Sequence, residues 1–254
     1  MILGVPRETY RSERRVAVTP LALPALIAGG FEVVVEGGAG DAAGFPDDAY
    51  RDRQAQVGSR EDCFSADAVA TVRTAGANPD AGREDLDRLR NDQVVVGFAD
   101  PLGSPEAALD VAEHGATLFA MELIPRITRA QPMDALSSQA TAAGYKAVLL
   151  AAAAMPKMFP MLTTAAGTIT PARVLVIGAG VAGLQAIATA RRLGAVVEAY
   201  DVRPAVKEQV ESLGARFVEL PLEAEDAEQA SGYAREMGER RVGKECRSRW
   251  SPYH

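Results

Sequence analysis

Residues 173–183 read Arg-Val-Leu-Val-Ile-Gly-Ala-Gly-Val-Ala-Gly, an apolar run that ends in three spaced glycines and leads into a helix-compatible stretch. This order predicts a strand, a tight turn and a helix. We expect Gly178 to allow the turn, Gly180 to let a pyrophosphate approach the backbone, and Gly183 to let helix and strand pack closely. The pattern therefore predicts a dinucleotide site at the start of the helix. The alternative is a glycine turn in another kind of α/β unit.

A second predicted strand, residues 195–200, is followed by Asp201, 18 residues after Gly183. A carboxylate there can accept hydrogen bonds from both ribose hydroxyls of an adenosine, and its charge repels the 2′-phosphate of NADP. Asp201 therefore favours NAD. Arg203 is a competing signal, because a cation nearby can accommodate a 2′-phosphate. We give Asp201 more weight because it lies at the strand end.

Length and composition exclude several classes of protein. The 254 residues allow two domains, and the 34 acidic against 27 basic residues argue against general attraction to nucleic acid. We find no run of about 18 apolar residues and no signal peptide pattern, so we expect that this chain does not itself cross a membrane. Cys63 and Cys246 have neither metal-ligand nor redox spacing, which predicts reduced cytosolic thiols and no metal site.

The first part of the chain alternates predicted strands with predicted helices. The short connection between its first two strands implies that they are parallel. The alternation predicts a doubly wound α/β domain. Strands are expected at residues 2–5, 31–36, 66–72, 93–98 and 116–120, and helices at 19–30, 47–56 and 106–115.

Residues 125–140 begin as a polar loop directly after a predicted strand end, where ligands bind in such sheets. The stretch carries a cation at Arg126, an amide at Gln131, a carboxylate at Asp134 and a hydroxyl at Ser137. These groups can hold a nicotinamide carboxamide and its ribose or pyrophosphate. The alternative is a helix cap formed by Asp134 or Ser137. The spacing supports both interpretations equally.

The rest of the chain predicts a second α/β domain. Residues 137–154 predict a long alanine-rich helix whose small side chains suit close packing between two domains, so we interpret it as their connector. After Asp201 we expect a helix at 204–213, a third strand at 215–220 and a loop at 221–237. The predicted fold is two Rossmann-like doubly wound domains joined by a long helix, the second of them incomplete. The predicted segments are an N-terminal domain at 1–136, the connecting helix at 137–160 and a nucleotide-binding domain at 161–238.

The residues quoted above resemble the family of alpha subunits of proton-translocating NAD(P) transhydrogenases, in the NAD(H)-binding domain. The resemblance covers residues 1–238 and is most specific at 126–145, 161–183 and 190–214. Residues 232–238, Gly-Tyr-Ala-Arg-Glu-Met-Gly, are similar to the start of the mobile loop that closes over the nucleotide in that family.

The resemblance implies direct hydride transfer between NADH held here and NADP(H) on a partner beta subunit, coupled to proton movement through a membrane domain. It also implies a homodimer of alpha subunits at the cytoplasmic face of the inner membrane. Hydride transfer between two rings requires apposition rather than a general acid or base, so no proton-transfer residue is assigned. The residues implied for the nicotinamide and pyrophosphate side are Arg126, Ile127, Thr128, Gln131, Asp134 and Ser137. Those implied around the adenosine are Val181, Asp201, Val202 and Arg203, with Gly232 and Tyr233 in the closing loop.

The sequence leaves two alternative functions to consider. Alanine dehydrogenases share the opening pattern of residues 6–8 and 15–20, but that family carries a lysine and a histidine in the N-terminal domain for its proton chemistry. The matching stretches here contain neither, and Arg73 can bind a carboxylate but cannot act as an acid or base near neutral pH. A non-catalytic NAD-binding module is the second alternative, because hydride transfer needs a partner.

The end of the sequence departs from the rest. Residues 239–254 carry five basic and two acidic residues and the single tryptophan. They resemble a translated sequencing adapter more than a basic lipid anchor, so we exclude them from the predicted fold. Because the later strands expected for the second domain do not follow, we expect this chain alone to bind NAD weakly or not at all and to lack transhydrogenase activity.

Overall fold

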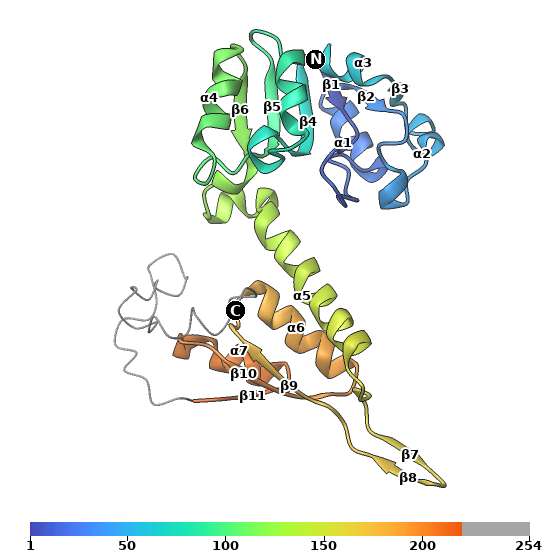
Figure 1. Ribbon diagram of the computed structural model, residues 1–254, viewed down its shortest axis with the longest axis vertical. Helices are drawn as coiled ribbons and strands as arrows, with labels where there is room; N and C mark the ends of the chain where they lie inside the picture. The colour runs from blue at the N-terminus through green and yellow to red at the C-terminus, as the bar shows by residue number, and fades with distance from the viewer. Residues whose placement is uncertain (220–254) are drawn as a thin grey trace, which may run out of the picture. The chain divides into compact units, whose positions relative to one another are not determined.

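The computed structural model describes residues 1–219 of the chain, which divide into two compact units. The first unit runs from Met1 to Ala135, and the second begins at Leu136 (Figure 1). Each unit has its own parallel sheet and its own apolar core.

A six-stranded parallel sheet organises the first unit. Its strand order is β3-β2-β1-β4-β5-β6, which places β1 inside the sheet between β2 and β4. Every pairing is parallel, because the chain passes through helices or helical turns between strands. The strands are β1 (Ile2–Val5), β2 (Glu32–Glu36), β3 (Gln56–Gly58), β4 (Ala68–Arg73), β5 (Val94–Phe98) and β6 (Thr117–Ala120).

Helices cover both faces of this sheet. On the face where Val5 is buried lies α1 (Leu23–Ala28), which shares a core cluster with it. On the opposite face lies α3 (Arg60–Phe64), so close that a Cβ added at Gly4 would lie 2.0 Å from the Cys63 carbonyl oxygen. Successive strand residues face opposite sides, so β1 is covered on both. The other helical elements of this unit are η1 (Pro20–Ala22), η2 (Asp41–Ala43), α2 (Asp47–Arg51), η3 (Ala75–Ala77), η4 (Gly82–Arg88), α4 (Pro105–Glu113), η5 (Met121–Leu123) and η6 (Thr128–Met133).

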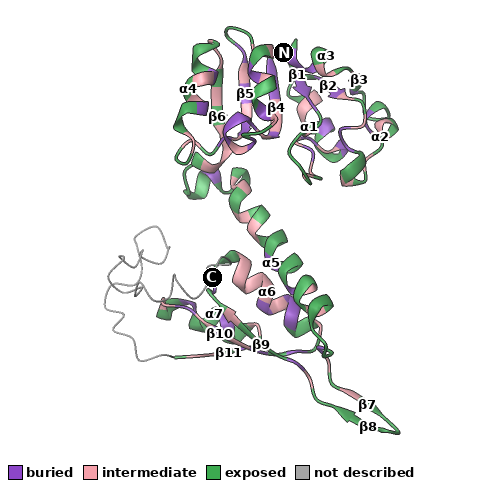
Figure 2. Cartoon of the chain, viewed as in Figure 1, coloured by how far each residue is buried: buried purple, intermediate pink, exposed green. Residues whose placement is uncertain are grey.

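The main core of the first unit lies around β1 and β2. Val5, Val33 and Val35 are almost completely buried. Figure 2 draws buried segments of the chain in purple. Tyr50 of α2 is also fully buried, and its hydroxyl donates a hydrogen bond to the Val18 carbonyl at 3.1 Å. That bond offsets the cost of removing a phenol hydroxyl from water.

A three-stranded parallel sheet of order β11-β10-β9 organises the second unit. The chain enters it through β9 (Arg173–Ile177) and continues into α6 (Val181–Arg192), which packs on the face of the sheet that holds Val197. On the other face Leu175 and Ile177 are 57% and 77% exposed in the part of the chain that the structure describes. The remaining elements are α5 (Ala135–Ala154), β7 (Leu162–Thr164), β8 (Gly167–Ile169), β10 (Val196–Tyr200), η7 (Pro204–Val206), α7 (Lys207–Ser212) and β11 (Arg216–Phe217).

The alanine-rich helix α5 packs against α6. A Cβ added at Gly144 would lie 2.1 Å from the Ala182 carbonyl oxygen, so only glycine permits this approach. Gly144 and Val148 are the buried residues of α5. The small residues of this helix therefore serve a contact inside the second unit.

The predicted α/β class is confirmed, and most predicted strands lie where expected. The helix predicted at 47–56 is wrong in its length. It ends at Arg51, because Gln54 adopts a left-handed conformation with φ of 67° and residues 56–58 pair with β2 as β3.

Among the described α-helices and strands, two further elements were not predicted. Helix α3 is one of them, and the antiparallel hairpin of β7 and β8 is the other. Figure 1 shows that this hairpin projects from the second unit. The third strand of the second sheet is also shorter than predicted, covering Arg216–Phe217 within the described residues.

No helix in residues 1–219 has both the length and the apolar character needed to cross a bilayer. The predicted loop at 221–237 and the tail at 239–254 lie outside the described residues.

Candidate functional site

The three glycines after β9 have three different surroundings. Gly178 has a positive φ of 93°, which glycine adopts without strain, and a Cβ added there would meet nothing within 4 Å. Gly180 precedes the first residue of α6, and a Cβ there would also point into open space. A Cβ at Gly183 would lie 1.8 Å from the Gly178 carbonyl oxygen. The roles predicted for turning and for close packing match this geometry, and the space before Gly180 can admit a phosphate.

Asp201 follows β10 directly and is linked to this turn. The side chain is only 5% exposed, and its Oδ2 accepts a hydrogen bond from the Ala179 N–H at 2.7 Å. In addition, the Gly178 N–H donates to the Tyr200 carbonyl at 2.8 Å. These two bonds hold the glycine turn and the end of β10 together at the carboxyl ends of the strands.

Arg203 surrounds the same carboxylate. Its backbone N–H and its Nε both donate to Asp201 Oδ1 at 2.9 Å, and its Nη2 donates to Oδ2 at 3.0 Å. Burial alone would favour the neutral acid, but the guanidinium and the two backbone N–H groups outweigh it and lower the pKa of Asp201. The carboxylate is therefore charged at neutral pH.

The structure brings together most of the residues predicted on the adenosine side. Val181 is the first residue of α6 and is 43% exposed, and Val202 lies between Asp201 and Arg203. Gly232 and Tyr233, predicted for the closing loop, lie outside the described residues.

The polar stretch after β6 folds as a short helical turn, η6. Arg126 Nε lies 4.0 Å from Asp134 Oδ2, so the cation and the carboxylate of this stretch form an ion pair within the first unit. Ile127, Thr128 and Gln131 are exposed along the same turn. Ala130 is buried and anchors the turn. Thr128 and Gln131 thus lie on one exposed turn, which is flanked by the charged pair of Arg126 and Asp134.

Ser137 lies on the first turn of α5, in the second unit. Both interpretations of this stretch keep their support, because Asp134 directly precedes α5 and still pairs with Arg126.

A second cluster of charged groups, in the first unit, was not predicted. Glu8 accepts hydrogen bonds from the backbone N–H groups of Val72 and Arg73 at 2.6 and 3.1 Å. Burial raises the pKa of Glu8 to about 7, with Glu13 adding to the effect against the two backbone bonds and Arg60. The signal in the sequence was the acidic residue just after the first strand.

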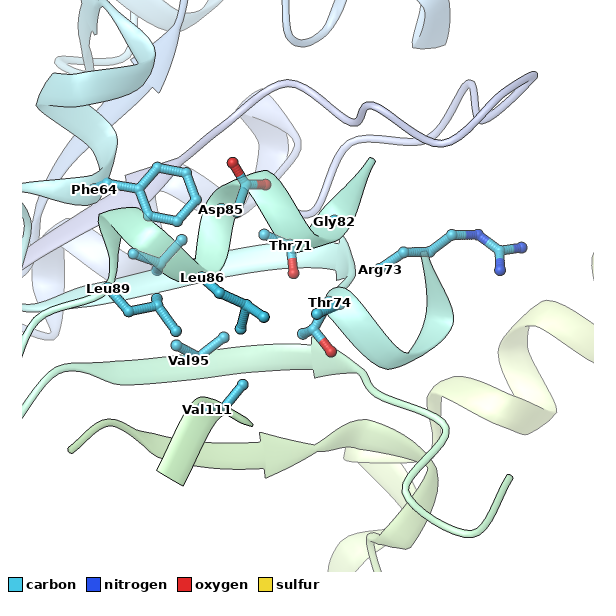
Figure 3. A pocket seen from close by; sticks show the side chains of 12 residues that line it. Phe64, Thr71, Arg73, Thr74, Gly82, Asp85, Leu86, Leu89, Val95 and Val111 are labelled. Carbon is cyan, nitrogen blue, oxygen red and sulfur yellow. The ribbon is translucent and has the colours of Figure 1, made fainter. Parts of the chain in front are cut away.

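Arg73 belongs to this cluster and is already engaged. Its Nε donates to Glu13 at 3.0 Å, and its guanidinium lies 4.2 Å from the centre of the Tyr10 ring. Figure 3 shows the guanidinium pointing away from the apolar side chains of the adjoining cavity, such as Leu86. Arg73, the residue considered as a carboxylate binder under the dehydrogenase alternative, is thus paired with Glu13.

The cavity itself has a volume of about 30 Å³ and lies between β4, β5, η4 and α4. Among the described residues, the Thr71 hydroxyl on its wall has no hydrogen-bond partner. A space of this size holds about one water molecule.

Comparison with known proteins finds a matching family model for each half of the chain. The family model for the alanine dehydrogenase/PNT N-terminal domain matches residues 4–143, and that for the C-terminal domain matches residues 147–242. The chain is 46% identical over 242 residues to the first polypeptide of the NAD(P) transhydrogenase alpha subunit of Rhodospirillum rubrum, covering 94% of this chain and 63% of that protein. The chain therefore spans less than two thirds of that relative's length.

Two further relatives separate the predicted functions. The crystal structure of a transhydrogenase from Sinorhizobium meliloti is similar with a TM-score of 0.82 and 49% identity, over 86% of this chain and 64% of that one. Alanine dehydrogenase of Mycobacterium tuberculosis is 29% identical over 211 residues, covering 80% of this chain and 54% of that protein. The resemblance noted in the sequence is confirmed, and the dehydrogenases are the more distant relatives.

Proposed function

The chain belongs to the alanine dehydrogenase/PNT family, and on this basis we propose that it is the NAD(H)-binding part of a transhydrogenase. The reaction passes hydride between NADH held here and NADP+ held on a partner beta subunit. The observation that carries the proposal is the edge formed by the glycine turn and Asp201, where open space at Gly180 adjoins a charged carboxylate. A pyrophosphate and an adenosine ribose need these two features side by side.

NAD is the proposed dinucleotide, rather than NADP, on this subunit. The charge of Asp201 repels a 2′-phosphate, and Arg203 supports NADP less than its sequence position suggested, because its guanidinium is bound to Asp201. Val181 and Val202 provide apolar neighbours for the adenosine, and Gly232 with Tyr233 would close over it.

The polar turn at η6 is the proposed nicotinamide and pyrophosphate side. The paired Arg126 and Asp134 offer a cation and a carboxylate, and Gln131 offers an amide that can both donate and accept. Ile127, Thr128 and Ser137 complete the set. Their role is to orient the ring for hydride transfer, which needs positioning rather than proton transfer.

The proposed assembly is supported by the names of the transhydrogenase relatives, which are subunits. We place the chain in a complex with a beta subunit that binds NADP(H) and with a proton-translocating membrane domain. A homodimer of the alpha subunit and a location at the cytoplasmic face of the inner membrane belong to the same proposal.

The test compares two carboxylates, one within β10 and one directly after it. Dissociation constants for NADH and NADPH are measured by saturation-transfer NMR, which detects weak binding, for the wild-type chain, Asp201→Asn and Glu198→Gln. We expect wild type and Glu198→Gln to prefer NADH by about tenfold or more, and Asp201→Asn to lose the preference. Equal affinity of the wild-type chain for both nucleotides, or binding of neither, contradicts the proposal.

A second measurement addresses catalysis. NADH oxidation is followed after a beta subunit loaded with NADP+ is added, and we expect hydride transfer only in the mixture. Binding of NADH without transfer in the mixture would support the non-catalytic module instead.

A further inference from the structure

We propose that Arg203 is a built-in competitor of the nucleotide, whose guanidinium occupies the places on Asp201 that the two ribose hydroxyls take. This inference rests on the proposed function, because it concerns the same nucleotide site. It assigns Arg203 a role in setting affinity and in selecting NAD over NADP.

The acceptor positions on Asp201 are all in use. A carboxylate has about four lone-pair positions, two on each oxygen. The structure gives each oxygen two donors: Oδ1 accepts from the backbone N–H and Nε of Arg203, and Oδ2 accepts from the Ala179 N–H and Nη2 of Arg203. A ribose hydroxyl can therefore bind only where a donor leaves.

The donors differ in whether they can leave. The Ala179 N–H lies in the glycine turn, and the Arg203 N–H lies two residues after Asp201, so both are fixed by the path of the backbone. The guanidinium is at the end of a rotatable side chain. The backbone donors therefore keep the carboxylate in place while the guanidinium leaves.

The groups that leave match the groups that arrive. Nε and Nη2 are joined through one carbon atom and donate one hydrogen bond to each oxygen of Asp201. The 2′- and 3′-hydroxyls of a ribose lie on adjacent carbon atoms and can donate in the same way. The exchange replaces two donors with two donors, so the buried carboxylate stays satisfied.

The exchange also discriminates between nucleotides. In NADP the 2′-oxygen carries a phosphate, which has no proton to donate when it is fully ionised, so only the 3′-hydroxyl remains. That nucleotide cannot replace both guanidinium bonds. Selection against NADP thus arises from the failure to displace Arg203 as well as from charge repulsion.

The test isolates the hydroxyls with a matched pair of ligands. ADP and 2′,3′-dideoxy-ADP differ only in the diol, and the ratio of their dissociation constants measures what the diol contributes. In Arg203→Met the competitor is gone, so we expect the preference for ADP over the dideoxy compound to rise by about tenfold relative to wild type. Taking the ratio cancels the loss of one positive charge, which affects both ligands equally.

Arg216→Met is the control, because Arg216 pairs with Glu198 on the same sheet and is exposed. We expect its ratio to equal that of wild type. Arg203→Gln, whose side chain has a single donor nitrogen and a shorter reach, should give an intermediate ratio. It also provides a second variant if Arg203→Met lowers the stability of the fold.

A second readout needs no substitution. The Nε–H signal of Arg203 in a ¹⁵N NMR spectrum of the wild-type chain should shift when ADP is added and stay in place when the dideoxy compound is added. The inference about Arg203 is overturned if the preference of Arg203→Met for ADP over the dideoxy compound equals that of wild type or is lower. The proposed function still stands in that case if NADH binding depends on Asp201. Failure of ADP and NADH to bind any of these chains overturns both.

Discussion

The glycine turn after β9 predicts that one substitution will disrupt folding and that its neighbour will disrupt binding. A methyl group at Gly183 would lie 1.8 Å from the Gly178 carbonyl oxygen, far inside normal contact distance. The obstacle is backbone and cannot rotate away, so α6 has to move from β9. Overpacking of this kind costs roughly 3 kcal/mol, and the better helix propensity of alanine returns about 1 kcal/mol. We therefore expect Gly183→Ala to lower the free energy of unfolding by about 2 kcal/mol.

Gly180→Ala is the matched substitution in the same turn. A Cβ there meets nothing within 4 Å, so we expect a stability change below about 1 kcal/mol. The added methyl group would fill the space proposed for the pyrophosphate, so NADH binding should weaken by about tenfold or more. Urea unfolding followed by far-UV circular dichroism measures the first effect, and saturation-transfer NMR measures the second.

Two outcomes would refute this reasoning, one for each substitution. If Gly183→Ala were as stable as wild type, the close contact between α6 and β9 would not exist in solution. If Gly180→Ala kept full affinity for NADH, the nucleotide would not approach the backbone at this turn.

Three further predictions concern stability. Because burial raises the pKa of Glu8 from 4.5 to about 7, the folded state binds more protons than the unfolded state between pH 4.5 and 7. The unfolding free energy of wild type relative to Glu8→Gln should therefore fall by roughly 2 to 3 kcal/mol from pH 5 to 8. A difference between the two proteins that does not change with pH would contradict this prediction. Arg60→Met leaves the partly buried carboxylate of Asp85 without its nearest cation and should cost roughly 2 kcal/mol in urea unfolding, whereas the exposed Arg51→Met should cost almost nothing. Gly144→Ala should separate α5 from α6 and lower the thermal midpoint of the second unit, and an unchanged midpoint would speak against their contact.

The sequence predicted long periodic elements well and short ones poorly. Strands β9 and β10 and helix α6 were found because apolar runs, glycines and a strand-end carboxylate agree with one another. Strand β3 has three residues, too few for any periodicity. Helix α3 has five, but Ser59 and Asp62 form a capping box that could have revealed it.

For the candidate site, the sequence indicated which residues to consider but not how their side chains contact one another. Asp201 and Arg203 were both identified from their positions, one as a ribose acceptor and the other as a possible phosphate binder. That they bind each other could not be read from the sequence, because it depends on the backbone turning after β10. The same limit applies to Glu8, whose donors come from residues 72 and 73, more than 60 positions away.

The place of β1 inside its sheet has a consequence for how the first unit folds. β1 pairs with β2 across 30 residues, from Ile2 to Glu32, and with β4 across 65, from Leu3 to Ala68. Contacts this distant form slowly, since the chain loses loop entropy before it gains a strand pair. The β7–β8 hairpin closes between Thr164 and Gly167 and can form within microseconds. During synthesis β1 therefore has both edges unpaired until β2 and β4 have emerged, and unpaired strand edges of this kind can pair with other chains and aggregate.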